Sequence, residues 1–259
     1  MAYPVTSIGR RGISLISRLG GMSMMLGRFL IALKEIPRSM SLIFEQLYVI
    51  GVRSLPLIIV ISVFVGAVAA WQAAYQFKFI GAPLRFLGQA VGKAVVIELA
   101  PVLSALVFAG RVGAGVAAEL ATMRVTEQID ALDSMGIDPV RFLVLPRILA
   151  SFMMLPLLVT FSIFIAILGG LAVSVIGVDI SSEMFLEGFR NSFQLQDFIN
   201  GLTKASVFGL LIGLVGCYEG FNAEGGAEGV GQATTTAVVI ASVLVLIFNF
   251  LFAMLLFKL

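Results

Sequence analysis

The chain has 259 residues, of which 59% are hydrophobic and 12% are charged, and its mean hydropathy is +1.07. Soluble domains are about 45–50% apolar and about 25% charged, so this composition excludes an ordinary soluble protein and predicts an all-α integral membrane protein. A single cysteine, Cys217, excludes an intrachain disulfide, and the lack of histidine excludes histidine metal sites and Ser-His catalysis.

Residues 1–53 form an N-terminal region that precedes a transmembrane domain at 54–259. At 100° per residue, Arg10 and Arg28 coincide on a helix over residues 7–33, and Arg11 and Arg18 lie within 100° of them. The rest of that helix is largely apolar. This pattern predicts an amphipathic helix that lies in the cytoplasmic interface of the membrane. The alternative is a sixth, poor span.

Five segments are long and apolar enough to cross a bilayer, which takes about 20 helical residues. Three of them carry no charge, namely 54–77, 148–178 and 229–257. Two others are interrupted by a few charges: residues 90–112 hold Lys93, Glu98 and Arg111, and residues 198–218 hold Lys204.

The distribution of Lys and Arg predicts the orientation of these spans. Seven of the 17 basic residues lie in 1–53 and four in the loop 111–147. The positive-inside rule therefore places both on the cytoplasmic side, and an odd number of spans places the C-terminus on the periplasmic side. The acidic, Gly-rich loop 218–232 departs from the rule, and is either a second docking element or a flexible turn.

Glu98 is predicted to lie inside the second span. A carboxylate at the centre of a span costs about 2.5–3.5 kcal/mol on insertion scales, so Glu98 is expected to face protein or a wet cavity. It either lines a substrate path or makes a structural hydrogen bond or ion pair. Lys93 and Lys204, near the predicted outer ends, are expected to extend to the lipid headgroups.

Small residues recur at helical spacing, which lets helix backbones approach closely. The longest such stripe runs along the fourth span, and shorter ones lie in the first two. Packing within one chain is favoured over a dimer contact for any single stripe. These positions are Gly66 and Ala70; Ala109, Gly113 and Ala117; and Ala205, Gly209, Gly213, Gly216 and Gly220.

The segment Thr126–Met135 reads as a short amphipathic helix in the loop between spans two and three. Ile129, Leu132 and Met135 fall on one side, Glu127 and Asp130 fall on the other, and Gly136 ends the helix. No basic residue occurs from 125 to 140. An acidic helix on the positive side of the membrane indicates docking to a basic groove of a soluble partner. The alternative is an ordinary surface helix.

Several chemistries are missing from the sequence. The stretch from Gly88 to Lys93 is one residue short of a phosphate loop and has no following Ser or Thr. No pair of aspartates lies within the spans. We therefore expect a non-catalytic subunit with no cofactor, no metal site and no nucleic-acid partner.

The run ELAPVLSALVFAGRVGAGVAAELATMRVTEQIDALDSMGIDP resembles the signature region of the MlaE/YrbE-type permeases. The resemblance extends over most of residues 45–240, through QLYVIGVRSLPLIIVISVFVGAV, LPR at 145–147 and GCYEGFNAEGGAEGVGQATTTAVV. These proteins are the membrane subunits of a bacterial ABC system that maintains outer-membrane lipid asymmetry.

The resemblance implies a homodimeric permease in the bacterial inner membrane, with phospholipid as its substrate. It also implies two copies of an ATPase subunit, a STAS-domain subunit and a periplasmic hexamer of MCE-domain subunits. The helix between spans two and three would then be the coupling helix that docks on the ATPase. A phospholipid path needs apolar walls and a few polar groups, and the candidates are Glu98, Leu99, Val102 and Leu103 with Phe64, Val68 and Trp71.

Two rival functions are an ion-coupled secondary transporter and a membrane scaffold that transports nothing. A secondary transporter is expected to show internal repeats and several ionisable groups near the midplane. The sequence shows no repeat, and Glu98 is its single central charge.

Overall fold

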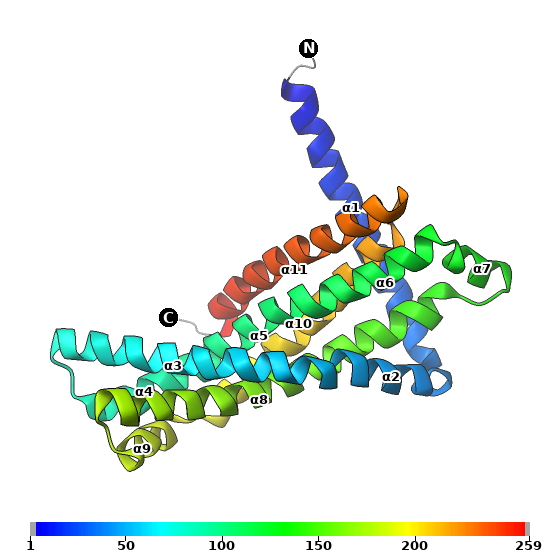
Figure 1. Ribbon diagram of the computed structural model, residues 1–259. Coiled ribbons are helices and arrows are strands. Elements are labelled where there is room, and N and C mark those ends of the chain that lie inside the picture. Colours follow the sequence, from blue (N-terminus) through cyan, green and yellow to red (C-terminus); the bar gives the residue numbers. More distant parts are fainter. Residues whose placement is uncertain (1–3, 257–259) are drawn as a thin grey trace.

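The computed structural model describes the backbone of residues 4–256 and the side chains of residues 17–255, and it is helical throughout, with short connections (Figure 1). Five helical segments are long and apolar enough to cross a membrane, which confirms the predicted number of spans. They run lengthwise through one bundle, with α7 at one end and α9 at the other (Figure 1). The segments are Met40–Ile80, Leu84–Val125, Val140–Val178, Leu195–Phe221 and Gly226–Leu255.

Before and within the first two spans the elements are α1 (Pro4–Ala32), η1 (Leu33–Arg38), α2 (Met40–Ile50), η2 (Val52–Ser54), α3 (Leu55–Ile80), η3 (Leu84–Phe86), α4 (Leu87–Ala94), η4 (Val95–Leu99), α5 (Ala100–Phe108), η5 (Ala109–Gly113) and α6 (Ala114–Val125). After them come α7 (Gln128–Ser134), η6 (Val140–Val144), α8 (Leu145–Val178), α9 (Ser182–Ser192), α10 (Leu195–Phe221) and α11 (Gly226–Leu256). The elements η4 and η5 are π-helical turns inside the second span, and η6 is a π-helical turn at the start of the third span.

The second span is longer than predicted. Its helix continues through the Gly-rich stretch after residue 112 and ends at Val125, so much of the predicted loop 111–147 is helical. Gly113 in this stretch packs closely against α10, since a Cβ on Gly216 would lie 3.0 Å from the carbonyl oxygen of Gly113, whereas a Cβ on Gly110 or Gly115 would meet nothing within 4 Å. The third span likewise begins at Val140 instead of residue 148.

The predicted N-terminal helix is present as α1, which crosses the α7 end of the bundle (Figure 1). It packs on α10: the Arg18 guanidinium lies 3.6 Å from the carboxylate of Glu219, and a Cβ on Gly21 would lie 2.4 Å from the Tyr218 hydroxyl. Arg18 thus contacts protein, although 44% of its side chain stays exposed. The side chains of Arg10 and Arg11 lie outside the described residues, and the interfacial position of α1 stays a prediction.

The small-residue stripes pack helix against helix within the chain, as predicted. The stripe on α10 faces α8 near its middle and α6 toward its end. A Cβ on Gly209 would lie 2.3 Å from the Ser151 carbonyl oxygen, and a Cβ on Gly220 would lie 2.7 Å from Cβ of Leu120. The stripe on α3 faces α8, where Gly66 meets Ala166 and Gly169 meets Val63.

Replacing Gly66 with alanine is expected to destabilise the bundle by about 1–3 kcal/mol or more, the usual cost of overpacking a core. The added Cβ would lie 1.7 Å from the Ala166 carbonyl oxygen, so α3 and α8 have to separate. Gly110→Ala is the matched control, since its Cβ meets nothing within 4 Å. Thermal unfolding of the purified variants is the measurement, and equal midpoints would contradict this packing.

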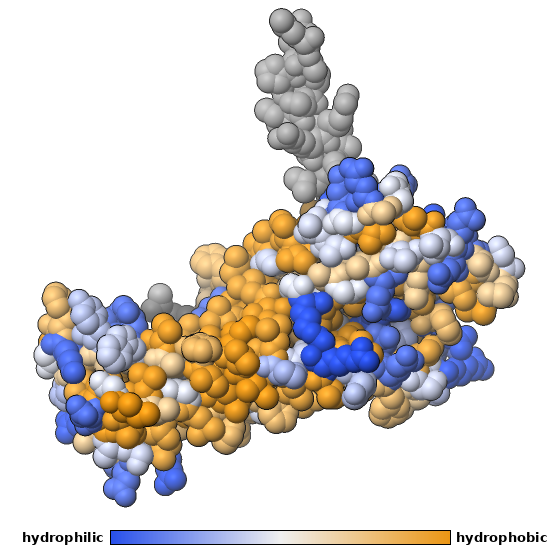
Figure 2. All heavy atoms as spheres, viewed as in Figure 1, coloured by the Kyte–Doolittle hydropathy of each residue, from blue (hydrophilic) through white to orange (hydrophobic). Residues whose placement is uncertain are grey.

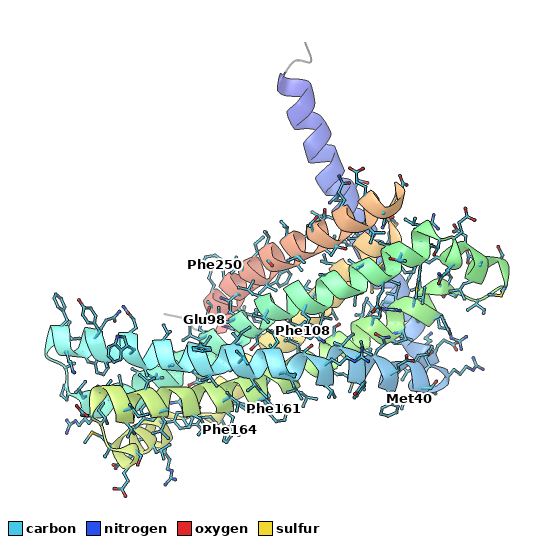
Figure 3. The ribbon with its side chains drawn as sticks, viewed as in Figure 1. Met40, Glu98, Phe108, Phe161, Phe164 and Phe250 are labelled. Atoms are coloured by element: carbon cyan, nitrogen blue, oxygen red, sulfur yellow. The ribbon has the colours of Figure 1, made fainter. Side chains whose placement is uncertain are left out.

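The surface of the bundle is apolar along its middle. Figure 2 shows a broad hydrophobic band between hydrophilic ends, and Figure 3 shows Phe161 and Phe164 pointing away from α8. Phe161, Phe164 and Phe250 are 51%, 62% and 63% exposed, whereas Phe108 is 1% exposed and belongs to the core. Exposed phenylalanines in such a band are what a lipid-embedded surface requires.

Candidate functional site: an ion-pair cluster beside an apolar groove

Glu98 lies in the π-helical turn η4, part-way along the second span (Figure 3). π-helical turns inside α-helices are frequent at functional sites. Pro101 follows closely and has no N–H, so the α-helical hydrogen bond to the carbonyl of Ile97 cannot form. Instead, the Lys204 ammonium from α10 donates to the Ile97 carbonyl at 3.3 Å. The local sequence thus leaves a backbone carbonyl next to Glu98 without its α-helical partner, and the Lys204 ammonium binds that carbonyl.

Glu98, Lys204 and Asn249 form a cluster that joins spans two, four and five. The Lys204 ammonium lies 2.9 Å from the carboxylate of Glu98 and donates to the side-chain oxygen of Asn249 at 3.3 Å. The amide nitrogen of Asn249 donates to the other Glu98 oxygen. Each carboxylate oxygen therefore accepts a hydrogen bond, and the carboxylate is held in one orientation.

The prediction for Lys204 was wrong. Its side chain is 0% exposed and does not reach the headgroups, because it pairs with Glu98 across the helix interface. The Glu98 side chain is 43% exposed, so the charged cluster opens on one side. Sequence reasoning missed Asn249, although a signal exists: it is the only amide or charged side chain between Thr236 and Phe257.

An apolar groove of about 620 Å³ lies beside the cluster, between α3 and the second span. Its volume is within the range of ligand sites, about 300–1,000 Å³. Four of the predicted wall residues line it together, namely Phe64, Val68, Leu99 and Leu103. The other lining residues are Ile61, Val65, Ala69, Gln72, Ala73, Gln76 and Ala94. Ala94 and Leu99 lie near Glu98 along the chain, but Glu98 is not among the lining residues, because its carboxylate is turned toward α10 and α11.

Two predicted wall residues do not line this groove. Val102 is 9% exposed and packs in the core. Trp71 lies about 100° round α3 from the lining residue Gln72, and its ring faces α8, where a Cβ on Gly177 would lie 2.9 Å from it. Trp71 and Gln72 are adjacent on α3 and therefore point in different directions: Gln72 faces the groove beside the second span, and Trp71 faces the end of α8.

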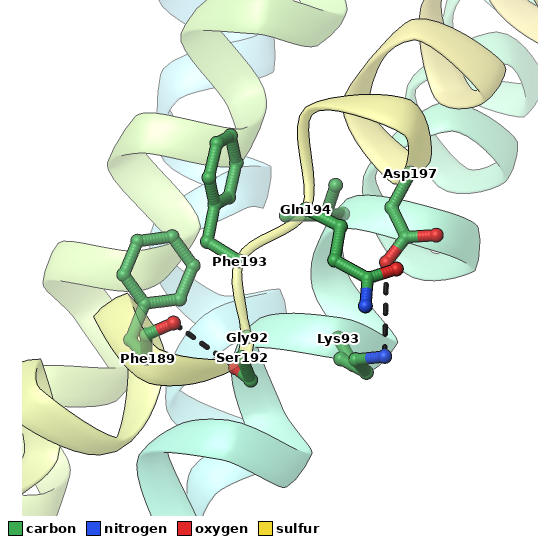
Figure 4. A pocket seen from close by; sticks show the side chains of 8 residues that line it. Gly92, Lys93, Phe189, Ser192, Phe193, Gln194 and Asp197 are labelled. Atoms are coloured by element: carbon green, nitrogen blue, oxygen red, sulfur yellow. Dashed lines mark hydrogen bonds and ion pairs between the residues drawn. The ribbon is translucent and has the colours of Figure 1, made fainter.

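Lys93, toward the α9 end, also forms an ion pair. Its ammonium lies 3.8 Å from the carboxylate of Asp197 and its side chain is 40% exposed. Figure 4 shows this pair next to Phe189, Phe193 and Gln194, around a hollow of about 10 Å³. That volume holds about one water molecule. The pair joins α4 to the start of α10 and is no ligand site of useful size.

The predicted docking helix is present as α7, over Gln128–Ser134, and Gly136 follows it with φ of 74°. Its apolar side is split. Ile129 is 5% exposed and Leu132 packs partly against the core, so these two hold α7 to the permease body, whereas Met135 is 65% exposed. Glu127 and Asp130 are exposed, and Asp130 pairs with Arg124 of α6. The free surface of α7 is therefore acidic, with a single large apolar residue.

The site combines one oriented carboxylate, one buried cation and an adjoining apolar surface. Within residues 17–255, no three acidic or cysteine side chains converge as metal ligands. An amphipathic molecule with a polar head and apolar tail matches both parts of the site.

The sequence model of the family described as permease MlaE matches residues 43–255. The chain belongs to the MlaE permease family. Relatives align along almost its whole length: a probable ABC transporter permease of Rickettsia felis is 41% identical, covering 97% of each chain. The intermembrane phospholipid transport system permease protein MlaE of Haemophilus influenzae is 34% identical, covering 98% of this chain and 97% of the relative. A probable ABC transporter permease of Synechocystis is 42% identical over 83% of this chain and 81% of the relative.

Membership of the MlaE family confirms the resemblance found in the sequence. The matched range contains all five spans apart from the start of the first, together with α7, Glu98, Lys204 and Asn249. The protein is a multi-pass membrane permease of the ABC transporter class.

Proposed function

We propose that this chain is the membrane subunit of an ABC transporter that moves phospholipids between the bacterial inner membrane and a periplasmic carrier, and so maintains outer-membrane lipid asymmetry. The observation that supports the proposal is the Glu98–Lys204–Asn249 cluster on the second span, where the nearby residues Ala94 and Leu99 line the apolar groove. The cluster offers polar contacts to a headgroup, and Phe64, Val68, Leu99 and Leu103 offer an apolar wall to acyl chains.

The energy for transport comes, in this proposal, from a separate cytoplasmic ATPase that docks on the exposed part of α7. Glu127, Asp130, Met135 and Gly136 are available to such a partner, while Ile129 and Leu132 transmit its movement to the bundle because they are packed into it. The permease itself is non-catalytic.

The assembly that we propose is a homodimer with two ATPase subunits, a STAS-domain subunit and a periplasmic MCE-domain hexamer. The exposed apolar surface supports a second copy: in the most apolar 18-residue stretch of span five, only 11% is buried in the rest of the chain. Lipid can also cover such a surface, so the oligomeric state is to be measured directly.

Co-purification tests the proposed function. The tagged permease, extracted from its native membrane, is expected to bring down an ATPase whose turnover rises when phospholipid is added. An ion-coupled transporter or a scaffold predicts no such stimulation. Recovery of the permease with no ATPase activity above that of an empty-tag control would contradict the proposal.

The proposed orientation predicts the location of two reporters. A fusion at Asp133, just inside α7, is expected to be cytoplasmic, and a fusion at Leu259 is expected to be periplasmic, because eleven of 17 basic residues lie on the α7 side. Paired alkaline phosphatase and fluorescent protein fusions provide the measurement. Reporters on the same side would rule out five spans.

A further inference from the structure

Two arginines lie together part-way along the first two spans, on the side of Glu98 that is nearer α7. Arg53 immediately precedes Ser54 and α3, and Arg111 lies in the π-helical turn η5 of the second span. The two are neighbours, because Arg111 is hydrogen-bonded to Ser54, the residue that follows Arg53. Among the side chains of residues 17–255, none that is acidic forms an ion pair with either of them. Two neighbouring cations without a carboxylate favour an anionic ligand.

Both guanidinium groups are held in place. Arg111 is partly buried and donates to the hydroxyl of Ser54. That hydroxyl is itself fixed, because Ser54 is 2% exposed and donates to the carbonyl of Ile50 at 2.5 Å. Arg53 lies over the ring of Tyr48, 5.8 Å from its centroid. A guanidinium has five N–H donors and the Ser54 bond uses one of Arg111's, so donors remain for a ligand.

The arginines adjoin the near end of the apolar groove. Ile61, which lines the groove, follows Ser54 by two helical turns, about 10 Å along α3, and Leu103 lies about 12 Å before Arg111. Figure 2 shows the hydrophobic band interrupted by a strongly hydrophilic patch in the region where α2 joins α3. Glu98, by contrast, precedes Arg111 by about 20 Å along the span.

We propose that Arg53 and Arg111 bind the phosphate of an anionic phospholipid whose acyl chains lie along the groove. The planar guanidinium matches phosphate oxygens with paired, charge-assisted hydrogen bonds. The Arg111 side chain does not simply extend to the headgroups of the surrounding bilayer, because it is hydrogen-bonded to the buried Ser54. The proposal shares its groove with the proposed function and to that extent rests on it, but its test measures lipid binding without ATPase or transport, so the two can fail separately.

Native mass spectrometry of the purified permease tests the site. The protein is titrated with phosphatidylglycerol in the presence of zwitterionic phosphatidylethanolamine. Arg53→Gln and Arg111→Gln are each expected to weaken phosphatidylglycerol binding about fivefold, the effect of one basic residue at an anionic surface. Arg85→Gln is the matched control, because Arg85 also lies over an aromatic ring, Phe86 at 4.8 Å, but toward the α9 end.

A Ser54→Ala variant and a competition with inorganic phosphate complete the test. Ser54→Ala keeps both charges and removes the hydrogen bond to Arg111, and it is expected to weaken binding less than either arginine variant. If Arg111→Gln does not fold, Arg53→Gln decides alone, since Arg53 is exposed. Equal weakening by Arg85→Gln, or none by Arg53→Gln, would overturn the site. Displacement of the lipid by millimolar inorganic phosphate would overturn a lipid as its ligand.

Discussion

The Glu98→Gln variant is expected to lose most phospholipid transport and to unfold more easily than the native protein. The substitution leaves the fully buried ammonium of Lys204 without the carboxylate that lies 2.9 Å away. Breaking a fully buried pair costs about 3–5 kcal/mol. Because the Glu98 side chain is 43% exposed, we expect a smaller loss, about 1–3 kcal/mol. Thermal unfolding and lipid transfer by proteoliposomes of the assembled transporter are the two measurements.

The double variant Glu98→Gln/Lys204→Met separates a lipid-handling role from a structural one. Removing both members of a buried ion pair is often neutral for stability, because no uncompensated charge is left. Stability is therefore expected to recover while transport stays low. Recovery of transport together with stability would show that the pair only braces the bundle.

Lys93→Met is the matched control for these variants. Lys93 forms an ion pair with Asp197 at 3.8 Å, but the Lys93 side chain is 40% exposed. Exposed pairs contribute about 0–1 kcal/mol, so this variant is expected to change neither stability nor transport appreciably. A loss as large as that of Glu98→Gln would mean that any charge change in this half of the bundle impairs transport.

Reversing the charge of α7 is expected to uncouple the permease from its ATPase. In Glu127→Lys/Asp130→Lys, two exposed carboxylates become cations, and opposing a basic groove with like charges costs several kcal/mol. The fold is expected to survive, since the surface pair of Asp130 with Arg124 contributes about 0–1 kcal/mol. Recovery of the ATPase with the tagged permease, and its turnover, are measured.

The control reverses two carboxylates at the opposite end of the bundle. Glu183→Lys/Glu187→Lys makes the same change of charge on the exposed side of α9, and full recovery of the ATPase is expected. Met135→Asp, directly after α7, is expected to weaken ATPase recovery, whereas Ile129→Asp within α7 is expected to destabilise the permease, because Ile129 is buried. Normal recovery and transport in the α7 double variant would contradict the docking role.

The spans were predictable because lipid imposes a single, strong requirement on length and charge. The uncharged runs at 54–77 and 148–178 lie inside observed spans, and the run that starts at 229 coincides with the fifth span up to Leu255. Helix ends were less predictable: the Gly-rich stretch after residue 112 was assigned to a loop, but the second span continues through it to Val125, with Gly113 packed against α10.

The site was predictable only in part. A carboxylate inside a span identified Glu98, but its partners come from positions 106 and 151 residues away in sequence. Hydropathy gives the depth of Lys204 in the span and not the helix that it faces, so its burial went unpredicted. For the same reason Trp71 and Val102 were wrongly predicted to line the groove. Both α3 and the second span contact neighbouring helices on several sides, and hydropathy does not tell these sides apart.

Lipid transfer driven by ATP tests the central claim most directly. The transporter, purified as a complex through this permease, is reconstituted with fluorescent phospholipid, and transfer to or from an acceptor carrier is followed with and without ATP. We expect transfer that requires ATP and falls in the Glu98→Gln/Lys204→Met variant. Equal transfer with and without ATP, or by the native and variant complexes, would contradict the account.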